Sequence, residues 1–124
     1  MAGFNIADLF ERVADAVPDR VAVVGGDERC TYAHLDTRAT RLANALAARG
    51  VAEGRHVACY LHNSVCHLEV MLACYKLRAV PVNVNDRYVL REVSYLCRDT
   101  GAVALFHDRD LAPHVVGLDV PTVV

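Results

Sequence analysis

The chain has 124 residues, which suffices for one domain or for part of a larger one. Its net charge of -2, with Lys and Arg scattered among Asp and Glu, excludes the basic footprint of a nucleic-acid-binding protein and the basic helix of a membrane-surface protein. A hydrophobic content of 54% is high for so small a body, which indicates apolar surface that a further segment would cover.

The chain carries no sequence signal for a membrane or for secretion. No apolar run reaches the roughly 20 residues that a membrane span needs, so no transmembrane segment is expected. The N-terminus lacks the basic and then apolar pattern of a secretory signal. The odd number of cysteines, all in apolar segments, predicts free thiols and a cytoplasmic protein; they are Cys30, Cys59, Cys66, Cys74 and Cys97.

The first expected elements are a helix and a small hairpin. Apolar residues recur every three or four positions over Ile6–Val17, which is the spacing of one helical face, and Asn5 is a suitable N-cap. The next residues predict two short strands, Arg20–Val24 and Glu28–Thr31, on either side of a Gly25-Gly26 turn.

A longer helix is expected to begin at Tyr32, with Thr31 as its cap and Gly50 just after its end. Its apolar stripe predicts the face that packs on the rest of the domain: Leu35, Ala39, Leu42, Ala43 and Leu46. Three arginines are expected to face away from this stripe: Arg38, Arg41 and Arg49.

The second half of the chain alternates strands and helices. Strands are expected over His56–Leu61, Ala79–Val84, Ala102–Phe106 and Val120–Val124. Between them, helices are expected over Val65–Leu77 and Val89–Arg98 and one helical turn over Leu111–Val115. Pro81 favours an edge position for its strand. The alternation predicts an α/β fold, a partial doubly wound parallel sheet with a small N-terminal hairpin. With so few helices, we expect the sheet to be covered incompletely.

Several sequence blocks carry a resemblance to a known family. They run from Phe4 to Val115 and include TYAHLDTRATRLANALAARGV at the second helix and YKLRAVPVNVNDRYVLREVSYL over Tyr75–Leu96. In their order and spacing these blocks resemble the front end of the AMP-forming acyl-CoA synthetases, in the adenylate-forming superfamily. The resemblance covers nearly the whole chain.

The segment around Arg87-Tyr88-Val89 is similar to actinobacterial ligases that act on fatty acids or on steroid side-chain carboxylates. Two residues depart from that pattern. Asp86 stands where those enzymes more often carry an aromatic residue, and Val93 stands where Leu is usual. The departures concern the subgroup and leave the family resemblance intact.

The resemblance implies a two-step reaction of the full-length family enzyme, with ATP, Mg and coenzyme A as its cofactors. A carboxylate is joined to AMP with release of pyrophosphate, and the thiol of coenzyme A then displaces AMP. It also implies that residues 1–124 are an incomplete N-terminal subdomain of an AMP-binding acyl-CoA ligase domain. The family's phosphate loop, acidic ligands and catalytic Lys have no counterpart in this sequence. We therefore expect no catalytic, cofactor-binding or metal-binding residue in the segment, and no activity from it alone.

The densest chemical cluster is Cys59, His62, Cys66 and His67, whose spacing superficially suits zinc. Cys66 and His67 are adjacent on a predicted helix and diverge by about 100°, so they do not easily face one ion. The structural interpretation, with cysteines as small buried hydrophobes, is preferred. Cys66 is also a candidate nucleophile, because the N-terminus of a helix favours a thiolate, with His62 or His67 as a candidate base.

Three further patterns have simpler interpretations. Gly25-Gly26 lacks the Gly-Lys-Ser/Thr ending of a phosphate-binding loop and reads as a hairpin turn. A binding surface is one interpretation of Arg87, Tyr88 and Arg91, but an exposed helix start is favoured. A solvated helix face, not an acid/base pair, is the favoured interpretation of Asp8, Glu11 and Asp15.

The leading hypothesis is a segment of an acyl-CoA ligase that activates a carboxylate, with a fatty acid favoured. One alternative is a non-catalytic interaction subunit or a truncated product, because bare apolar surface favours a partner. Another is a fragment of an amino-acid or aryl-acid adenylation domain. The expected partners are the remainder of the ligase, in the same or a separate chain, and a carboxylic-acid substrate, with a homo-oligomer left open and nucleic acid excluded.

Overall fold

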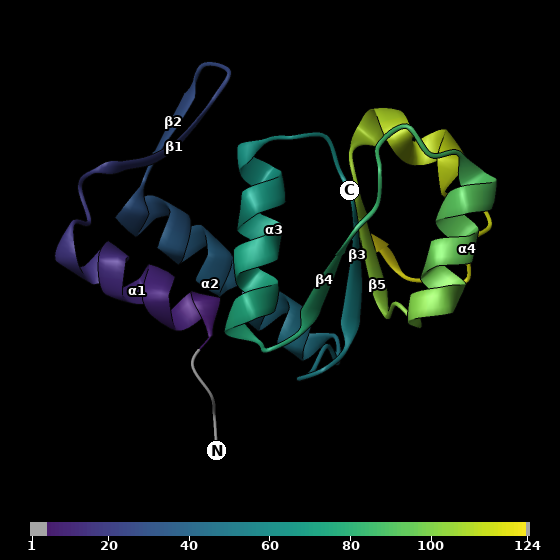
Figure 1. The fold of residues 1–124 in the computed structure, drawn as a ribbon, viewed down its shortest axis with the longest axis horizontal. Helices are drawn as coiled ribbons and strands as arrows, with labels where there is room; N and C mark the ends of the chain where they lie inside the picture. The colour runs from purple at the N-terminus through teal and green to yellow at the C-terminus, as the bar shows by residue number, and fades with distance from the viewer. Residues whose placement is uncertain (1–4, 124) are drawn as a thin grey trace.

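The computed structural model describes residues 5–123 of the chain. Its elements form two parts that pack against each other: a hairpin flanked by α1 and α2, and a parallel sheet with helices on both faces (Figure 1). Helix α3 (Val65–Lys76) lies between the two parts and contacts both of them. The expected α/β class with a small hairpin is confirmed.

Helix α1 spans Ile6–Ala16 and begins with the cap that the sequence predicts. The Asn5 side chain accepts a hydrogen bond from the Ala7 amide at 2.7 Å, and the Asp8 carboxylate accepts one from the Asn5 amide at 3.1 Å. These reciprocal bonds form a capping box, which satisfies amides that the first helical turn leaves free.

The hairpin consists of β1 (Val21–Gly25) and β2 (Glu28–Thr31), paired antiparallel. Gly26 has a φ of 58°, a conformation that glycine adopts without a steric cost, so the predicted turn is confirmed. Strand β2 leads directly into α2 (Tyr32–Ala48), whose first turn is capped by the Thr31 hydroxyl.

The larger sheet has four parallel strands in the order β4-β3-β5-β6. These strands are β3 (His56–Tyr60), β4 (Val80–Asn83), β5 (Ala104–His107) and β6 (Thr122–Val123). Pro81 lies in the edge strand β4, as its missing amide predicts. The connecting elements are α3, α4 (Leu90–Thr100) and the 3-10 helix η1 (Arg109–His114).

Helices cover the sheet on both faces, which makes it doubly wound. On one face α2 and α3 bury side chains such as Val57 and Cys59 of β3. On the other face α4 and η1 bury Ala58 and Tyr60 of the same strand. The expectation of incomplete coverage is therefore wrong for the central strands, because one helix and a 3-10 turn are enough to cover the short second face. It holds for edge strand β4, where Val80 is 41% exposed.

The last strands differ in their bounds from the sequence expectation. The strand expected over Ala102–Phe106 is displaced toward the C-terminus, at Ala104–His107, since Ala102 instead closes the turn after α4. The helical turn begins earlier than expected, because Asp108 starts η1 directly after β5. Of the last expected strand, Thr122–Val123 is paired, and Val124 lies outside the described residues.

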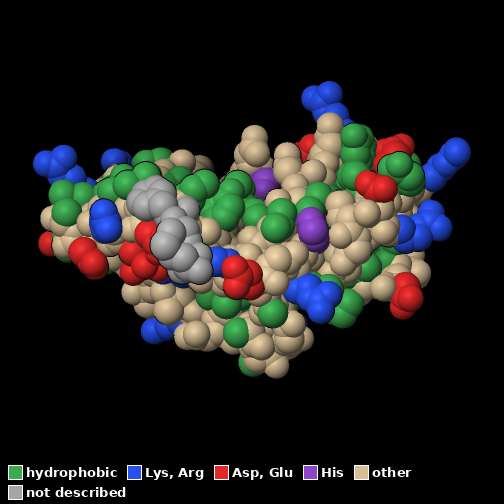
Figure 2. All heavy atoms as spheres, turned by 60° about the horizontal axis from the view of Figure 1, so that its bottom comes forward, with side chains coloured by type: hydrophobic (Ala, Val, Ile, Leu, Met, Phe, Trp, Pro, Cys, Tyr) green, Lys and Arg blue, Asp and Glu red, His purple; other side chains and the backbone are tan. Residues whose placement is uncertain are grey.

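Some large apolar side chains remain on the surface. Figure 2 shows hydrophobic side chains at both ends of the molecule, interspersed with charged ones. The most exposed belong to α1, the hairpin, the start and middle of α4 and the segment after η1; they include Ile6, Leu9, Val24, Val89, Tyr95 and Val116. Within residues 5–123 no helix combines the length and the apolar character needed to cross a bilayer.

The third apolar cluster, between the hairpin and helices α2 and α3, predicts a large effect for one substitution. Leu35 is 1% exposed, whereas Leu9 on α1 is 52% exposed. We expect Leu35→Ala to lower the free energy of unfolding by about 2–5 kcal/mol through lost contacts and a cavity. The matched control Leu9→Ala should change it by less than about 1 kcal/mol. Urea unfolding followed by circular dichroism measures both, and equal losses would contradict this packing.

Candidate functional site

The carboxyl edge of the parallel sheet is the first place to look for a site. From β3 the chain passes to β4 on one side and then to β5 and β6 on the other side. In open α/β sheets, ligands bind outside the carboxyl ends of the strands at such a reversal of strand order. The segments at this position are residues 61–64 after β3 and residues 108–110 after β5.

His62 joins three loops at this edge. Its Nδ1 lies 2.8 Å from Oδ2 of Asp86, which follows β4, and its Nε2 lies 2.9 Å from Oδ2 of Asp110, which follows β5. Its backbone amide donates to Oδ2 of Asp108 at 2.6 Å. We call these four residues the His62 cluster. The sequence reasoning placed His62 in a metal or base set and did not foresee its carboxylate partners.

The carboxylates of this cluster determine its protonation. Hydrogen bonds with Asp86 and then Asp110 raise the pKa of His62 to about 9. The hydrogen bond with His62 in turn lowers the pKa of Asp86. At neutral pH the ring is therefore an imidazolium that donates from both nitrogens.

Two hollows flank the cluster. One of about 180 Å³ is lined mostly by polar groups, including Asn63, Asn83 and Asn85. The other, of about 370 Å³, lies beside Leu42, Val70 and Phe106 and is more apolar. The cluster itself sets three carboxylates against one imidazolium, and the cations Arg87 and Arg109 lie in the adjoining segments.

The residues considered for zinc do not converge in the structure. Cys59 lies in β3 with its thiol 3.7 Å from the Val57 carbonyl, while the His62 ring is engaged by the two aspartates. Cys66 is exposed at the start of α3. Within residues 5–123 there is no group of three His, Cys, Asp or Glu side chains that could hold a metal ion.

The nucleophile hypothesis for Cys66 is not supported by its surroundings. Ser64 caps α3 by accepting from the His67 amide, which places Cys66 in the first turn. Desolvation by the groups packed around it, followed by the charges of Glu69 and Asp108, raises the pKa of the Cys66 thiol, although Cys66 remains exposed at the surface. The helix terminus was expected to favour the thiolate, but desolvation and nearby carboxylates outweigh it.

The segment with Arg87, Tyr88 and Arg91 forms an exposed helix start, the interpretation that the sequence favoured over a binding surface. The Asn85 side chain accepts from the Arg87 amide at 2.9 Å, and Glu92 accepts from the Val89 amide at 3.1 Å. The buried Tyr60 hydroxyl donates to the Tyr88 carbonyl and fixes this loop to β3. The charged side chains point to solvent, so no ligand contact follows from them.

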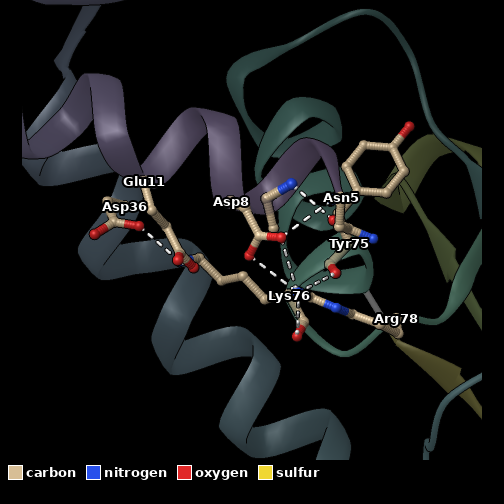
Figure 3. Close-up of polar contacts among 8 residues, drawn as sticks. Asn5, Asp8, Glu11, Asp36, Tyr75, Lys76 and Arg78 are labelled. Carbon is tan, nitrogen blue, oxygen red and sulfur yellow. Dashed lines mark hydrogen bonds and ion pairs between the residues drawn. The ribbon is translucent and has the colours of Figure 1, made fainter. Parts of the chain in front are cut away.

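A second polar cluster joins the end of α3 to α1 and α2 (Figure 3). Lys76 Nζ lies 2.8 Å from Oε1 of Glu11 and 2.6 Å from Oδ1 of Asp36. Arg78 Nη2 lies 2.9 Å from Oδ1 of Asp8. The expected solvated face of α1 is thus wrong for Asp8 and Glu11, because α3 ends beside it and supplies two cations. For the exposed Asp15 no such contact is formed among the described residues.

Arg38 also differs from expectation. It was predicted to face away from the core of the domain, but its guanidinium lies 2.8 Å from Oε2 of Glu69 on α3 and 3.4 Å from Oε1 of Glu28 on β2. Glu69 is 15% exposed, so the ion pair offsets the cost of burying its charge. Arg41 and Arg49 are exposed, as predicted.

Comparison with known proteins identifies relatives along nearly the whole chain. The family model described as "AMP-binding enzyme" matches residues 10–123. The chain is 46% identical, over 121 residues, to a medium/long-chain-fatty-acid–CoA/3-oxocholest-4-en-26-oate–CoA ligase of Mycobacterium marinum, covering 96% of the chain and 22% of that ligase. It is 42% identical, over 114 residues, to a 3-oxocholest-4-en-26-oate–CoA ligase of Rhodococcus rhodochrous, covering 92% of the chain and 20% of the relative.

Solved structures share the same fold. The N-terminal domain of FACL13 from Mycobacterium tuberculosis superposes with a TM-score of 0.88 at 32% identity, covering 96% of this chain and 32% of that one. NpsA-ThdA, an artificially fused adenylation–PCP di-domain from Klebsiella oxytoca, gives a TM-score of 0.87 at 28% identity. This match covers 96% of the present chain and 23% of NpsA-ThdA. The chain thus spans about a fifth of the length of the curated relatives it matches.

The contacts of Lys76 predict a loss of stability when its charge is removed. Burial opposes the charge of Lys76, but the contacts with Asp36 and Glu11 outweigh it and raise its pKa. Lys76→Gln leaves these two carboxylates without their cation and should lower the free energy of unfolding by about 1–3 kcal/mol. The exposed control Arg41→Gln should change it by less than about 0.5 kcal/mol. Urea unfolding measures both, and equal effects would show that the cluster contributes nothing.

The burial of the thiols predicts an order of alkylation. Cys66 is exposed, whereas burial raises the pKa of both Cys59 and Cys74 to about 12. We expect iodoacetamide at pH 8 to modify Cys66 of the native protein before the other two, as peptide mapping by mass spectrometry would show. After denaturation all three should react at similar rates. Early modification of Cys59 would contradict the buried position of β3.

Proposed function

Because the chain belongs to the AMP-binding enzyme family, we propose that it forms the N-terminal segment of an acyl-CoA ligase. The observation that carries this proposal is the 46% identity over 96% of the chain to a ligase named for medium- or long-chain fatty acids and a steroid carboxylate. The proposed substrate is accordingly a fatty acid or a steroid side-chain carboxylate. The chain spans 22% of that relative, so the activity of the whole protein is part of the proposal.

In the proposed reaction the substrate carboxylate attacks the α-phosphate of ATP, which releases pyrophosphate and leaves acyl-AMP. The thiol of coenzyme A then attacks the acyl carbon and releases AMP. Both steps develop negative charge on phosphate oxygens, which Mg or cationic donors must stabilise. In the His62 cluster the imidazolium is already engaged by Asp86 and Asp110, which supports a positioning role for residues 1–124 as one subdomain of the ligase.

We therefore assign ATP, Mg and coenzyme A to other segments of the ligase. Within this chain we assign no catalytic, cofactor-binding or metal-binding residue. The partner proposed for the segment is the remainder of the ligase, which would cover apolar side chains such as Tyr95, 62% exposed, and Val116, 69% exposed.

The test uses the ligase that carries this segment in its native source. We expect it to form AMP and acyl-CoA from ATP, coenzyme A and either palmitate or a 3-oxo steroid acid, with benzoate as the control acid. Mass spectrometry would identify the thioester. A preference for benzoate would contradict the proposed substrate class, and formation of ADP instead of AMP would contradict the reaction.

The isolated segment supplies a second test. Residues 1–124 should catalyse no carboxylate-dependent exchange of pyrophosphate into ATP, because they lack groups that bind the phosphates. Exchange by the isolated segment at a rate above that of a heat-treated sample would overturn the assignment of catalysis to other segments.

An adenylation domain for aryl acids is the second candidate. It is favoured by the fold shared with NpsA, whose N-terminal subdomain has been solved with anthranilyl-AMSN at 30% identity to this chain. The acyl-CoA ligase ranks first because its relatives share a larger fraction of residues over the same length. Transfer of an activated aryl acid to a carrier protein, without formation of a CoA thioester, would favour the second candidate.

A further inference from the structure

We propose that His62 is a proton-dependent clamp that holds the loops after β4 and β5 against the loop after β3. The three loops are remote in sequence, since His62 lies 24 residues from Asp86 and 48 residues from Asp110. One imidazole ring contacts both aspartates, through opposite nitrogens. The clamp involves no substrate or cofactor, so it is independent of the proposed ligase function.

No other described hydrogen bond replaces this connection. Among residues 5–123, the loop after β4 is fixed to β3 by the Tyr60 hydroxyl, and the loop after β5 is fixed to it by Asp108 and the His62 amide. Among the hydrogen bonds and ion pairs of residues 5–123, the His62 ring supplies the only link between the loop after β4 and the segment after β5, above the apolar contacts of Val84, Leu111 and Val115. Its loss would therefore loosen the two segments at the sheet edge while leaving the sheet and its apolar core intact.

The clamp requires a charged ring. Both ring nitrogens face carboxylates, and only the imidazolium donates from both at once. A neutral ring would turn one nitrogen lone pair toward an aspartate and leave Asp86 and Asp110 to repel each other. The charged groups that face the ring are Asp86 after β4 and Asp108 and Asp110 after β5, with Arg87 acting on Asp86.

The direction of the pH dependence follows from these contacts. The contacts raise the pKa of His62 to about 9, above the value of about 6.5 for an unfolded chain. A raised pKa contributes stability that is complete below the unfolded value and is lost as the pH rises through the folded value. The clamp is thus closed at neutral pH and opens as the pH passes 9.

The deciding experiment is a titration of the His62 ring in the intact protein. Carbon-13-labelled histidine gives ring signals by NMR, and the signal lost in His62→Gln assigns His62. We expect its pKa near 9, and we expect Asp86→Asn and Asp110→Asn each to lower it. A pKa near about 6.5 would overturn the clamp. A pKa that responds to only one of the two aspartates would overturn the bridging geometry.

Limited proteolysis tests the mechanical consequence. Trypsin cleaves after Arg87, in the loop after β4, and after Arg109, at the start of η1; both residues are exposed. At pH 7.5, His62→Gln should speed cleavage at these sites about two- to fivefold, the range expected for an exposed ion pair. Wild type at pH 10 should approach the rate of that variant, while His62→Gln, which has no titrating ring, should show the same ratio to Arg55 cleavage at both pH values.

Two controls separate the clamp from general unfolding. Cleavage after Arg55, exposed in the turn before β3, normalises the activity of trypsin and should be the same in all variants. His34→Gln, at an exposed position on α2, should match wild type. Equal cleavage at Arg87 and Arg109 in wild type and His62→Gln would overturn the proposal, as would a parallel increase at Arg55.

Discussion

The two-sided burial of β3 is the constraint on which the rest of the structure depends. Its side chains alternate between the core under α2 and α3 and the core under α4 and η1. Its backbone pairs with β4 at one edge and β5 at the other. Parallel strands are stable only when both faces are covered. The helix pairs on the two faces, and the loops that leave its carboxyl end, are therefore positioned by this strand.

The N-terminal part is fixed to the sheet by α3 through both apolar and charged contacts. Leu72 of α3 belongs to the cluster that includes Leu35 of α2, while Lys76 and Arg78 reach carboxylates on α1 and α2. Apolar contacts supply most of the free energy of packing, but they are not directional and allow one helix to shift along another. A half-buried ion pair is satisfied in one arrangement of the helices. Arg78 adopts a left-handed φ of 59°, a strained conformation that its contact with Asp8 helps to offset.

The sequence was sufficient for the elements, their order and the fold class, because these depend on local signals. Apolar periodicity located the helices, Asn5 and Thr31 marked their starts, and Pro81 marked the edge strand. It was insufficient for the polar clusters. Glu11 reads as solvated on α1, because its cation, Lys76, lies 65 residues away. The partners of His62 are equally remote, and no periodicity connects them. One sequence signal could have predicted the ion pairs of α1: two cations, Lys76 and Arg78, stand at the end of an apolar helix, where they need carboxylate partners.

The charged side chains at the carboxyl edge depend on the fold that brings their loops together. A reversal of strand order is where an α/β sheet usually binds its ligand, and phosphate sites there rely on helix N-termini and cations. Here Glu69, one turn into α3, pairs with Arg38, and the neighbouring loops present Asp86 and Asp110 to the His62 ring. Without His62 these aspartates would also repel each other. The imidazolium thus allows acidic loops to converge at the end of a buried strand.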